Sequence, residues 1–266
     1  MNKNISIRIL STLMLISVFT LGNIALAGNS EPVKGSDEKQ NWAEKLGYPA
    51  GKKVLILHAD DAGMCEEANI STKYYLENDY IQSAAVMVPC PAADDFIKWA
   101  IQNPKEDVGV HLTLTSEWKE YRWPTILATA KVPGLIDPEG KMWHEIPQVV
   151  MNASAEEVEK EIRAQIDYVL SMGLKPGHMD THMGTLYGHP SFVQAFFKVA
   201  MEYGIPANAI ELSDEAVVKE FREKGYPIND DVIKLANNYT LPKVDNFTSA
   251  PNSETYKEKV NDFKQL

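Results

Sequence analysis

The sequence predicts an α/β fold, in which helices cover a parallel sheet that is either open or closed into a barrel. Short apolar runs alternate with helical patterns along most of the 266 residues, which is typical of parallel strands joined by helices. Acidic and histidine residues follow three of these runs, where the strands of a parallel sheet end and active sites form. The hydrophobic content of 44% and the charged content of 24% are those of an ordinary globular protein.

The N-terminus has the pattern of a secretory signal peptide over residues 1–27. Lys3 and Arg8 supply a positive start, and the stretch 9–24 is almost wholly apolar. Ala27 and the residue two positions before it are small, as a signal peptidase requires. We therefore expect cleavage near Ala27, a secreted or periplasmic protein, and no stable membrane anchor.

The mature protein is expected to be acidic and to contain one domain. Cleavage removes two positive charges, which takes the net charge from −11 to −13. Such a protein is not expected to bind nucleic acid or anionic membranes, whereas a neutral sugar fits this charge. Residues 28–45 are polar and are predicted to form a flexible lead-in, followed by one domain over 46–266. Oligomeric state does not follow from these features.

The elements are predicted from apolar periodicity and from their end signals. The helix over 154–172 is the best defined, because Ser154 and Glu157 form a capping box and Gly173 ends it. The long stretch 115–147 is rich in Trp, Pro and Gly and shows no period. The other predicted elements are strands at 54–57, 83–88, 108–114, near 177–181 and at 209–212, and helices at 66–77, 91–102 and 190–203.

The end of the chain predicts a last helix that Ser253 could cap. Its apolar positions, from Tyr256 onward, continue to Leu266 without a residue that stops a helix. The five or six predicted strands are also few for a closed barrel. We therefore expect the barrel to be incomplete at the C-terminus, and the alternative is a helix that frays at the surface.

Three side chains at predicted strand ends form a candidate metal site. Asp61 follows the first strand, His111 lies near the end of the third, and His182 follows the fourth. One carboxylate and two imidazoles suit one divalent metal ion, with Zn²⁺ or Mg²⁺ favoured and Mn²⁺, Co²⁺ or Ni²⁺ as alternatives. Taken alone, each residue could instead have a purely structural role, because an Asp pair often caps a helix and a single histidine often lies in a core.

Further polar residues of the same strands are candidates for catalysis. Asp60 is expected to act as the general base, with His58 on the same face to orient it. His178, Asp180 and His182 occupy alternate positions and therefore share one face of their strand. We expect His178 to serve as a catalytic acid or to contact a metal ligand.

The long stretch between the third and fourth strands is a candidate for substrate binding. Trp118, Arg122 and Trp123 are the predicted sugar-binding residues, and Tyr121 and Trp143 lie in the same stretch. Aromatic faces stack against the apolar side of sugar rings, and arginine donates to hydroxyl groups. The alternative is that these rings only hold the loop to the domain.

The motifs resemble those of the YdjC-like carbohydrate deacetylases, a family that includes chitooligosaccharide deacetylases. The resemblance rests on three segments that occur in the family's order and spacing, at 59–63, 109–114 and 177–182. Any one of them is a weak signal, but three in order are specific. The similar region extends from about Lys52 to Leu212.

This resemblance implies both a fold and a reaction. The implied fold is an irregular barrel related to that of the polysaccharide deacetylases, and most members continue past the position of Leu266. The implied metal ligands are Asp61, His111 and His182, with Asp60 as the base. The implied reaction is hydrolysis of an N-acetyl group on an amino sugar, which releases acetate.

Two other functions remain open at the level of the sequence. A phosphoesterase could use the same metal site, but it should place more basic residues there, and Arg122 is the only candidate. A non-catalytic sugar-binding protein, derived from a shortened barrel, would keep the aromatic loop and lack activity even with metal.

Overall fold

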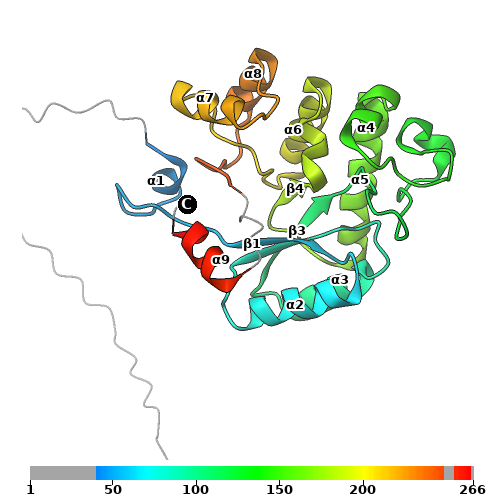
Figure 1. Ribbon diagram of the computed structural model, residues 1–266, viewed down its shortest axis with the longest axis horizontal. Helices are drawn as coiled ribbons and strands as arrows, with labels where there is room; N and C mark the ends of the chain where they lie inside the picture. The colour runs from blue at the N-terminus through cyan, green and yellow to red at the C-terminus, as the bar shows by residue number, and fades with distance from the viewer. Residues whose placement is uncertain (1–39, 249–254, 265–266) are drawn as a thin grey trace, which may run out of the picture. The chain divides into compact units, whose positions relative to one another are not determined.

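The computed structural model describes residues 40–248 and 255–264, which belong to one α/β unit around a parallel sheet (Figure 1). The predicted signal peptide, residues 28–39 of the predicted lead-in, Ser253 and Leu266 lie outside the described residues. Within the described ranges no helix is long and apolar enough to cross a membrane.

The sheet has four strands, and each is parallel to its neighbours. Their order across the sheet is their order along the chain, with His58 beside Ser83, Ser83 beside Asp107, and His111 beside Asp180. The predicted α/β class with parallel strands is therefore confirmed. The strands are β1 (His58–Ala62), β2 (Ser83–Val86), β3 (Asp107–Leu112) and β4 (Met179–Thr181).

Helices surround the strands in chain order. Figure 1 shows α2 and α3 along the lower side of the sheet, α5 beside them and α6 above, so the chain winds round the sheet in one direction. The helices that follow the strands are α2 (Glu66–Glu77), α3 (Ala93–Gln102), α4 (Ile146–Asn152), α5 (Ala155–Met172) and α6 (Pro190–Tyr203).

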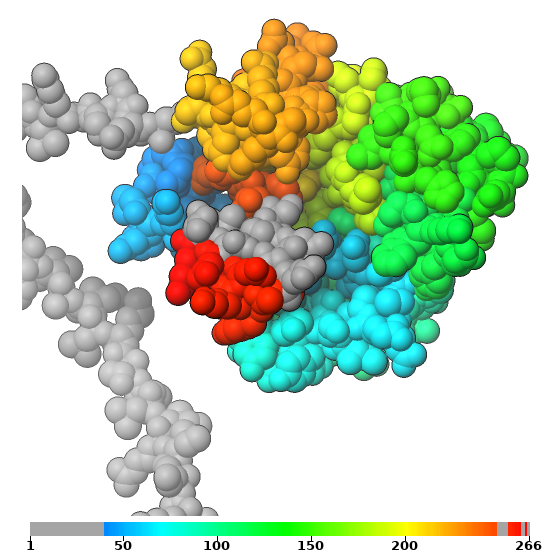
Figure 2. Space-filling view, in the orientation of Figure 1, coloured from blue at the N-terminus to red at the C-terminus, as the bar shows by residue number. Residues whose placement is uncertain are grey.

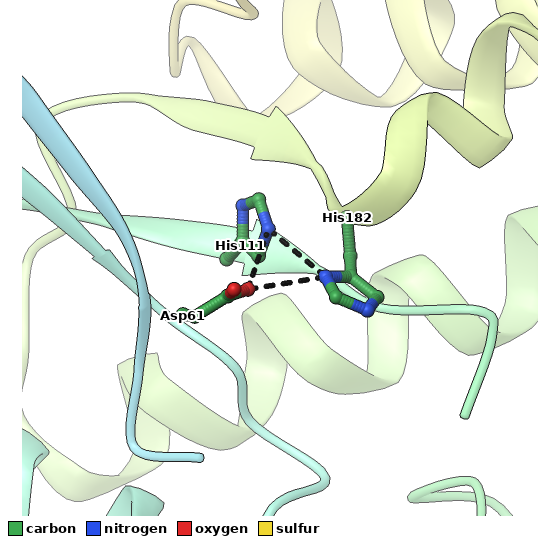
Figure 3. A group of neighbouring side chains, drawn as sticks. All are labelled: Asp61, His111 and His182. Atoms are coloured by element: carbon green, nitrogen blue, oxygen red, sulfur yellow. Dashed lines mark hydrogen bonds and ion pairs between the residues drawn. The ribbon is translucent and has the colours of Figure 1, made fainter. Parts of the chain in front are cut away.

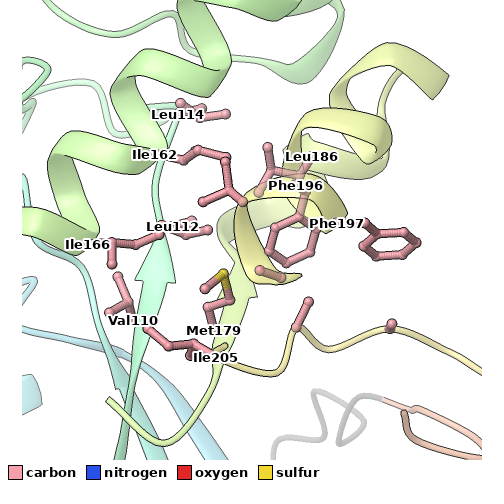
Figure 4. Close-up of a cluster of buried hydrophobic side chains, with 14 of the residues drawn as sticks. Val110, Leu112, Leu114, Ile162, Ile166, Met179, Leu186, Phe196, Phe197 and Ile205 are labelled. Carbon is pink, nitrogen blue, oxygen red and sulfur yellow. The ribbon is translucent and has the colours of Figure 1, made fainter. Parts of the chain in front are cut away.

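Local signals explain the best-predicted helix. Ser154 caps α5 and Glu157 completes the capping box, while Gly173 ends the helix with a φ of 101°. The apolar stripe of α5 packs on β3. Figure 4 shows Ile162 and Ile166 beside Val110 and Leu112, in the core between α5, α6 and the sheet. The predicted limits of α2 and α6 agree with the structure.

The first strand begins later than the apolar run predicts. β1 starts at His58, and Val54, Leu55 and Ile56 are exposed by 41%, 74% and 58%. The prediction of a buried strand at 54–57 is wrong for a physical reason. Pairing with the β2 segment begins at Leu57, which bonds to Gln82, so the residues before it have no strand beside them there.

Among the described residues past β4, the sheet continues through single bridges. Ala207 pairs with Met179, and Ile210 pairs with Val244, both in parallel. The strand predicted at 209–212 is therefore reduced to one bridge. The same part of the chain contains two helices that the sequence pattern did not indicate, α7 (Glu215–Glu223) and α8 (Asp230–Asn238).

The two ends of the described chain are also helical. Helix α1 (Trp42–Lys45) lies in the predicted lead-in, where Trp42 bonds to Asp245 through its backbone and to Glu211 through its indole. Residues 40–45 thus belong to the same compact unit as the rest of the described chain. Helix α9 (Tyr256–Phe263) corresponds to the predicted last helix.

The segment between β3 and α5 forms one side of the molecule. Figure 2 shows it as a continuous green surface next to α6, which is yellow. It contains two short 3-10 helices, η1 (Thr129–Lys131) and η2 (Pro133–Leu135), in addition to α4. A third, η3 (His182–Tyr187), follows β4 directly. These elements frame the carboxyl ends of β3 and β4.

Candidate metal centre

An irregularity at the end of β1 positions Asp61. The register between β1 and β2 shifts between Ala59 and Ala62, as at a β-bulge, and Asp61 has a φ of 59°. A bulge redirects a side chain, and Asp is one of the few residues that tolerates the left-handed region. The carboxylate of Asp61 thereby turns toward the ends of β3 and β4.

Three donor atoms from separate elements converge beyond the sheet (Figure 3). Asp61 Oδ1 lies 3.1 Å from His182 Nδ1 and 3.4 Å from His111 Nε2, and the two nitrogens are 3.3 Å apart. A metal ion with bonds of about 2.1 Å separates adjacent ligand atoms by roughly 3.0–3.4 Å. The three predicted ligands therefore fit a divalent metal ion in both chemistry and spacing.

Each imidazole is held from behind by another carboxylate. His111 Nδ1 lies 2.7 Å from Asp180 Oδ1, and His182 Nε2 lies 3.0 Å from Glu117 Oε2. A ring nitrogen that donates to a carboxylate carries the proton, which leaves the other nitrogen with a lone pair. His111 therefore presents Nε2 to the centre and His182 presents Nδ1.

The charges around the centre favour a cation. Burial by itself raises the pKa of Asp61, but hydrogen bonds and charge from His111 and His182 outweigh it and hold this pKa below its usual range. Burial lowers the pKa of His111, but Asp180 and Asp61 outweigh that effect and raise it to about 10. Metal ligation needs the imidazole lone pairs, so protons and metal compete for this site.

Asp60 and His58 do not form the pair that the sequence suggested. Asp60 is exposed next to Asp61. His58 instead bonds to Ser83 Oγ and to Asp180 Oδ2, each at 3.0 Å. One ring nitrogen of His58 thus contacts Asp180, the residue behind His111, and the other contacts Ser83.

His178 lies at the other end of the strands. Its Nε2 is 3.4 Å from Ser83 Oγ and its Nδ1 is 3.4 Å from Asp107 Oδ1, and both partners are the first residues of their strands. The sequence predicts that His178 and Asp180 lie on the same face of their strand, and these contacts agree with that prediction. The structure does not bring His178 to the three donor atoms, so its position does not support the predicted role as a catalytic acid.

Comparison with known proteins identifies the family. The YdjC-like protein family matches residues 54–265, which is most of the chain. The chain belongs to the YdjC-like family. It is 26% identical over 167 residues to a carbohydrate deacetylase of Thermoanaerobacter pseudethanolicus, covering 63% of this chain and 64% of that protein. It is 32% identical over 160 residues to a carbohydrate deacetylase of Thermus thermophilus, covering 60% and 54%.

A solved structure shares the fold. The crystal structure of a cellobiose-phosphate cleavage protein of Enterococcus faecalis matches with a TM-score of 0.54 and 26% identity, over 63% of this chain and 62% of that chain. The YdjC-like chain thus spans between about half and two thirds of the length of the relatives it matches.

Two of the three predicted substrate residues of this YdjC-like chain are used within the protein. The guanidinium of Arg122 pairs with Asp137 at 2.7 Å and with Glu139 at 3.0 Å, and it also donates to backbone carbonyls. Trp123 is buried, and its indole donates to the Thr115 carbonyl. The contacts of Arg122 and Trp123 therefore agree with the alternative interpretation, in which these side chains hold the loop to the domain.

Other aromatic side chains of the loop remain accessible. Trp118 is 51% exposed, and Tyr121 is 39% exposed while its hydroxyl donates to the Met64 carbonyl. Trp123 packs against the ring of His182 from the protein side, with the ring centroids 6.2 Å apart. Trp118 is therefore the predicted substrate residue that the structure leaves free to contact a ligand.

Sequence reasoning missed the part that Glu117 plays in the YdjC-like site. Glu117 lies five residues after Leu112, the last residue of β3, and directly before Trp118. No recognised motif includes a glutamate at this position. The available signal was its occurrence in a loop that starts at the end of a strand bearing a ligand. Asp180, by contrast, was indicated by its alternation with His178 and His182.

Proposed function

We propose that this YdjC-like chain is a metal-dependent hydrolase that removes N-acetyl groups from amino sugars or short oligosaccharides, such as chitooligosaccharides, and releases acetate. The observation that carries the proposal is the convergence of Asp61, His111 and His182 at metal-ligand spacing. The relatives named carbohydrate deacetylase support the sugar substrate and the reaction.

One divalent ion is the proposed cofactor, with Zn²⁺ or Mg²⁺ favoured and Mn²⁺, Co²⁺ or Ni²⁺ as alternatives. When bound, it would supply Lewis acidity that polarises the amide carbonyl and lowers the pKa of water. Asp61, His111 and His182 would hold it. Asp180 would keep His111 in the tautomer that ligation requires.

Asp60 is the proposed general base. Its exposed carboxylate would take one proton from the attacking water while the carbon–oxygen bond forms. The carbon–nitrogen bond then breaks, and the proton passes to the leaving amine, so that acetate and a free amino sugar result. Trp118 is the proposed platform for a sugar ring at the rim.

The ion pairs of Arg122 argue against the phosphoesterase alternative. Its guanidinium is paired with Asp137 and Glu139, so it does not supply the positive charge that a phosphate would need beside the metal. An amide of a neutral sugar is the better match to an acidic surface. A non-catalytic sugar-binding protein would differ from the proposed deacetylase only in the absence of turnover.

We also propose that the strands form part of an irregular barrel and that the protein is exported. The sequential order of four parallel strands, with helices following round them, supports the barrel. The pattern of residues 1–27 supports export to the periplasm or the medium.

Acetate release tests the proposed function. The metal-stripped full chain is incubated with N-acetylglucosamine oligomers after addition of Zn²⁺, Mg²⁺, Mn²⁺ or Co²⁺. We expect at least one metal to restore acetate release. Asp60→Asn should abolish release and keep metal binding, His182→Ala should lose both, and His189→Asn should retain both as a control outside the site.

Three outcomes would contradict the proposal or one of its assigned roles. If metal binds but no oligomer yields acetate, the sugar-binding alternative applies to this chain. If the metal-loaded protein instead releases phosphate from a phosphate monoester, the phosphoesterase alternative applies. Equal acetate release by the Asp60→Asn variant would remove Asp60 from the role of base.

A further inference from the structure

Glu117 is the one acidic residue of its loop segment that turns toward the metal centre. Its side chain is 27% exposed, whereas Glu120, three residues along the same loop, is 87% exposed beside Lys119. Glu117 Oε2 lies 3.0 Å from His182 Nε2, on the far side of the ring from Asp61 and His111. The contact therefore reaches the ligand without entering the space between the three donor atoms.

The backbone that carries Glu117 is fixed by buried groups. Thr115 and Ser116 are fully buried. The Ser116 hydroxyl accepts from the Trp123 amide at 3.0 Å, the Ser116 amide donates to the Trp143 carbonyl at 2.8 Å, and the Ser116 carbonyl accepts from Arg122 at 3.2 Å. Glu117 thus extends from an anchored point rather than from a loose loop.

His182 needs such a partner because its own backbone leaves the regular strand. It follows the last residue of β4, and the next two residues, Met183 and Gly184, have φ values of 55° and 73°. Besides the donor atoms of the centre, its ring contacts Trp123 in a T-shaped arrangement and Glu117 at Nε2. A proton on Nε2 satisfies the Glu117 carboxylate and leaves Nδ1 free for metal.

We infer that Glu117 is a positioning residue that fixes the tautomer and orientation of His182, so that the substrate-binding loop and the metal centre are assembled together. The opposite tautomer would place a proton on Nδ1 between the donor atoms, and it would bring the Nε2 lone pair to within 3.0 Å of a carboxylate oxygen. This inference rests on the proposed metal-dependent function.

Metal affinity and the Co²⁺ spectrum test the inference in the full chain. Glu117→Leu removes the acceptor, Glu117→Gln keeps an acceptor oxygen without the charge, and Glu120→Leu is the matched control on the same loop. Competition with a chelating dye gives the Kd for Zn²⁺, and visible absorption of the Co²⁺ form reports the geometry of the ligands. Thermal melts without added metal establish that each variant is folded.

We expect Glu117→Leu to weaken metal binding by about 10- to 100-fold, as changes to the partners of metal-bound histidines do. It should also alter the Co²⁺ absorption bands. Glu117→Gln should recover part of the affinity and the wild-type spectrum, and Glu120→Leu should match wild type. A merely structural role would not change the spectrum of the bound ion.

The outcomes separate this inference from the proposed function. If wild type and Glu120→Leu bind metal and Glu117→Leu binds with the same Kd and spectrum, the inference is overturned and the metal site stands. If wild type binds no metal at this site, both are overturned. If Glu117→Leu does not fold, Glu117→Ala takes its place, and a wild-type Kd and spectrum in that variant overturn the inference.

Discussion

Arg122 and Asp137 form a buried ion pair inside the loop between β3 and α5. Their side chains are 6% and 5% exposed, and the closest atoms are 2.7 Å apart. Removing one partner of a buried pair leaves the other charge uncompensated, which costs about 3–5 kcal/mol. We expect Arg122→Ala to lose a comparable part of the free energy of unfolding in urea, whereas Lys119→Ala, at 92% exposure, should stay within about 0.5 kcal/mol of wild type. An equal effect of the two changes would contradict the structural role of Arg122.

The same pair gives the stability a defined pH dependence. Burial raises the pKa of Asp137, but hydrogen bonds from the Lys141 and Glu139 amides and from Arg122 outweigh it and lower this pKa from the ordinary value of 3.8. A lowered pKa stabilises the folded state above the ordinary value, and this stabilisation is lost as the pH falls through the folded value.

Urea unfolding of wild type and Asp137→Asn at several pH values checks this sign. The difference in unfolding free energy should be complete at neutral pH and should shrink as the pH falls below about 4. A difference that stayed constant down to the acid limit of folding would show that the charge of Asp137 is not the stabilising feature.

At the scale of elements, α5 fixes the long loop through two buried polar side chains. Glu161 accepts from the backbone amides of Ile126 and Leu127 at 2.8 and 3.1 Å. Gln165, one turn later, bonds to both backbone groups of Thr113 and to Glu161. The apolar stripe predicted for this helix gave no hint of these contacts, because their partners are backbone atoms of an irregular segment.

Glu161→Leu should therefore loosen the loop rather than the helix. Two partly buried amides lose their acceptor, at up to about 1–3 kcal/mol each, so we expect a loss of about 2 kcal/mol or more of stability in urea. Limited proteolysis should also cut more rapidly within residues 115–147. Glu156→Gln, an exposed position on the same helix, serves as the control. Faster cleavage in that variant as well would argue against a specific role of Glu161 in holding the loop.

Helix α5, strand β1 and the candidate metal centre show which features could be predicted from the sequence and which could not. Capping residues defined α5 to within one residue, because they act locally. The start of β1 was predicted too early, because the apolar run 54–57 says nothing about where a neighbouring strand begins. The convergence of Asp61, His111 and His182 could be predicted from strand ends. The contact of Glu117 could not, because it depends on a loop without periodicity.

At the scale of the whole molecule, the metal should be part of the stability of the fold. A ligand that binds only the folded state at 100 times its Kd adds about 2.7 kcal/mol. For a chain of this size that corresponds to a rise in Tm of about 5–10 °C. Calorimetry should show this rise for wild type and not for His182→Ala, and an equal rise in both would place the metal elsewhere.

The most direct test of the metal-dependent hydrolase is a titration of the metal-stripped full chain in which bound metal and acetate release are followed together. The proposed function predicts that release from N-acetylglucosamine oligomers grows with bound metal and stops growing at one ion per chain. His111→Ala should bind no ion at this site and release no acetate. Release that did not depend on bound metal, or full binding by His111→Ala, would contradict the central claim.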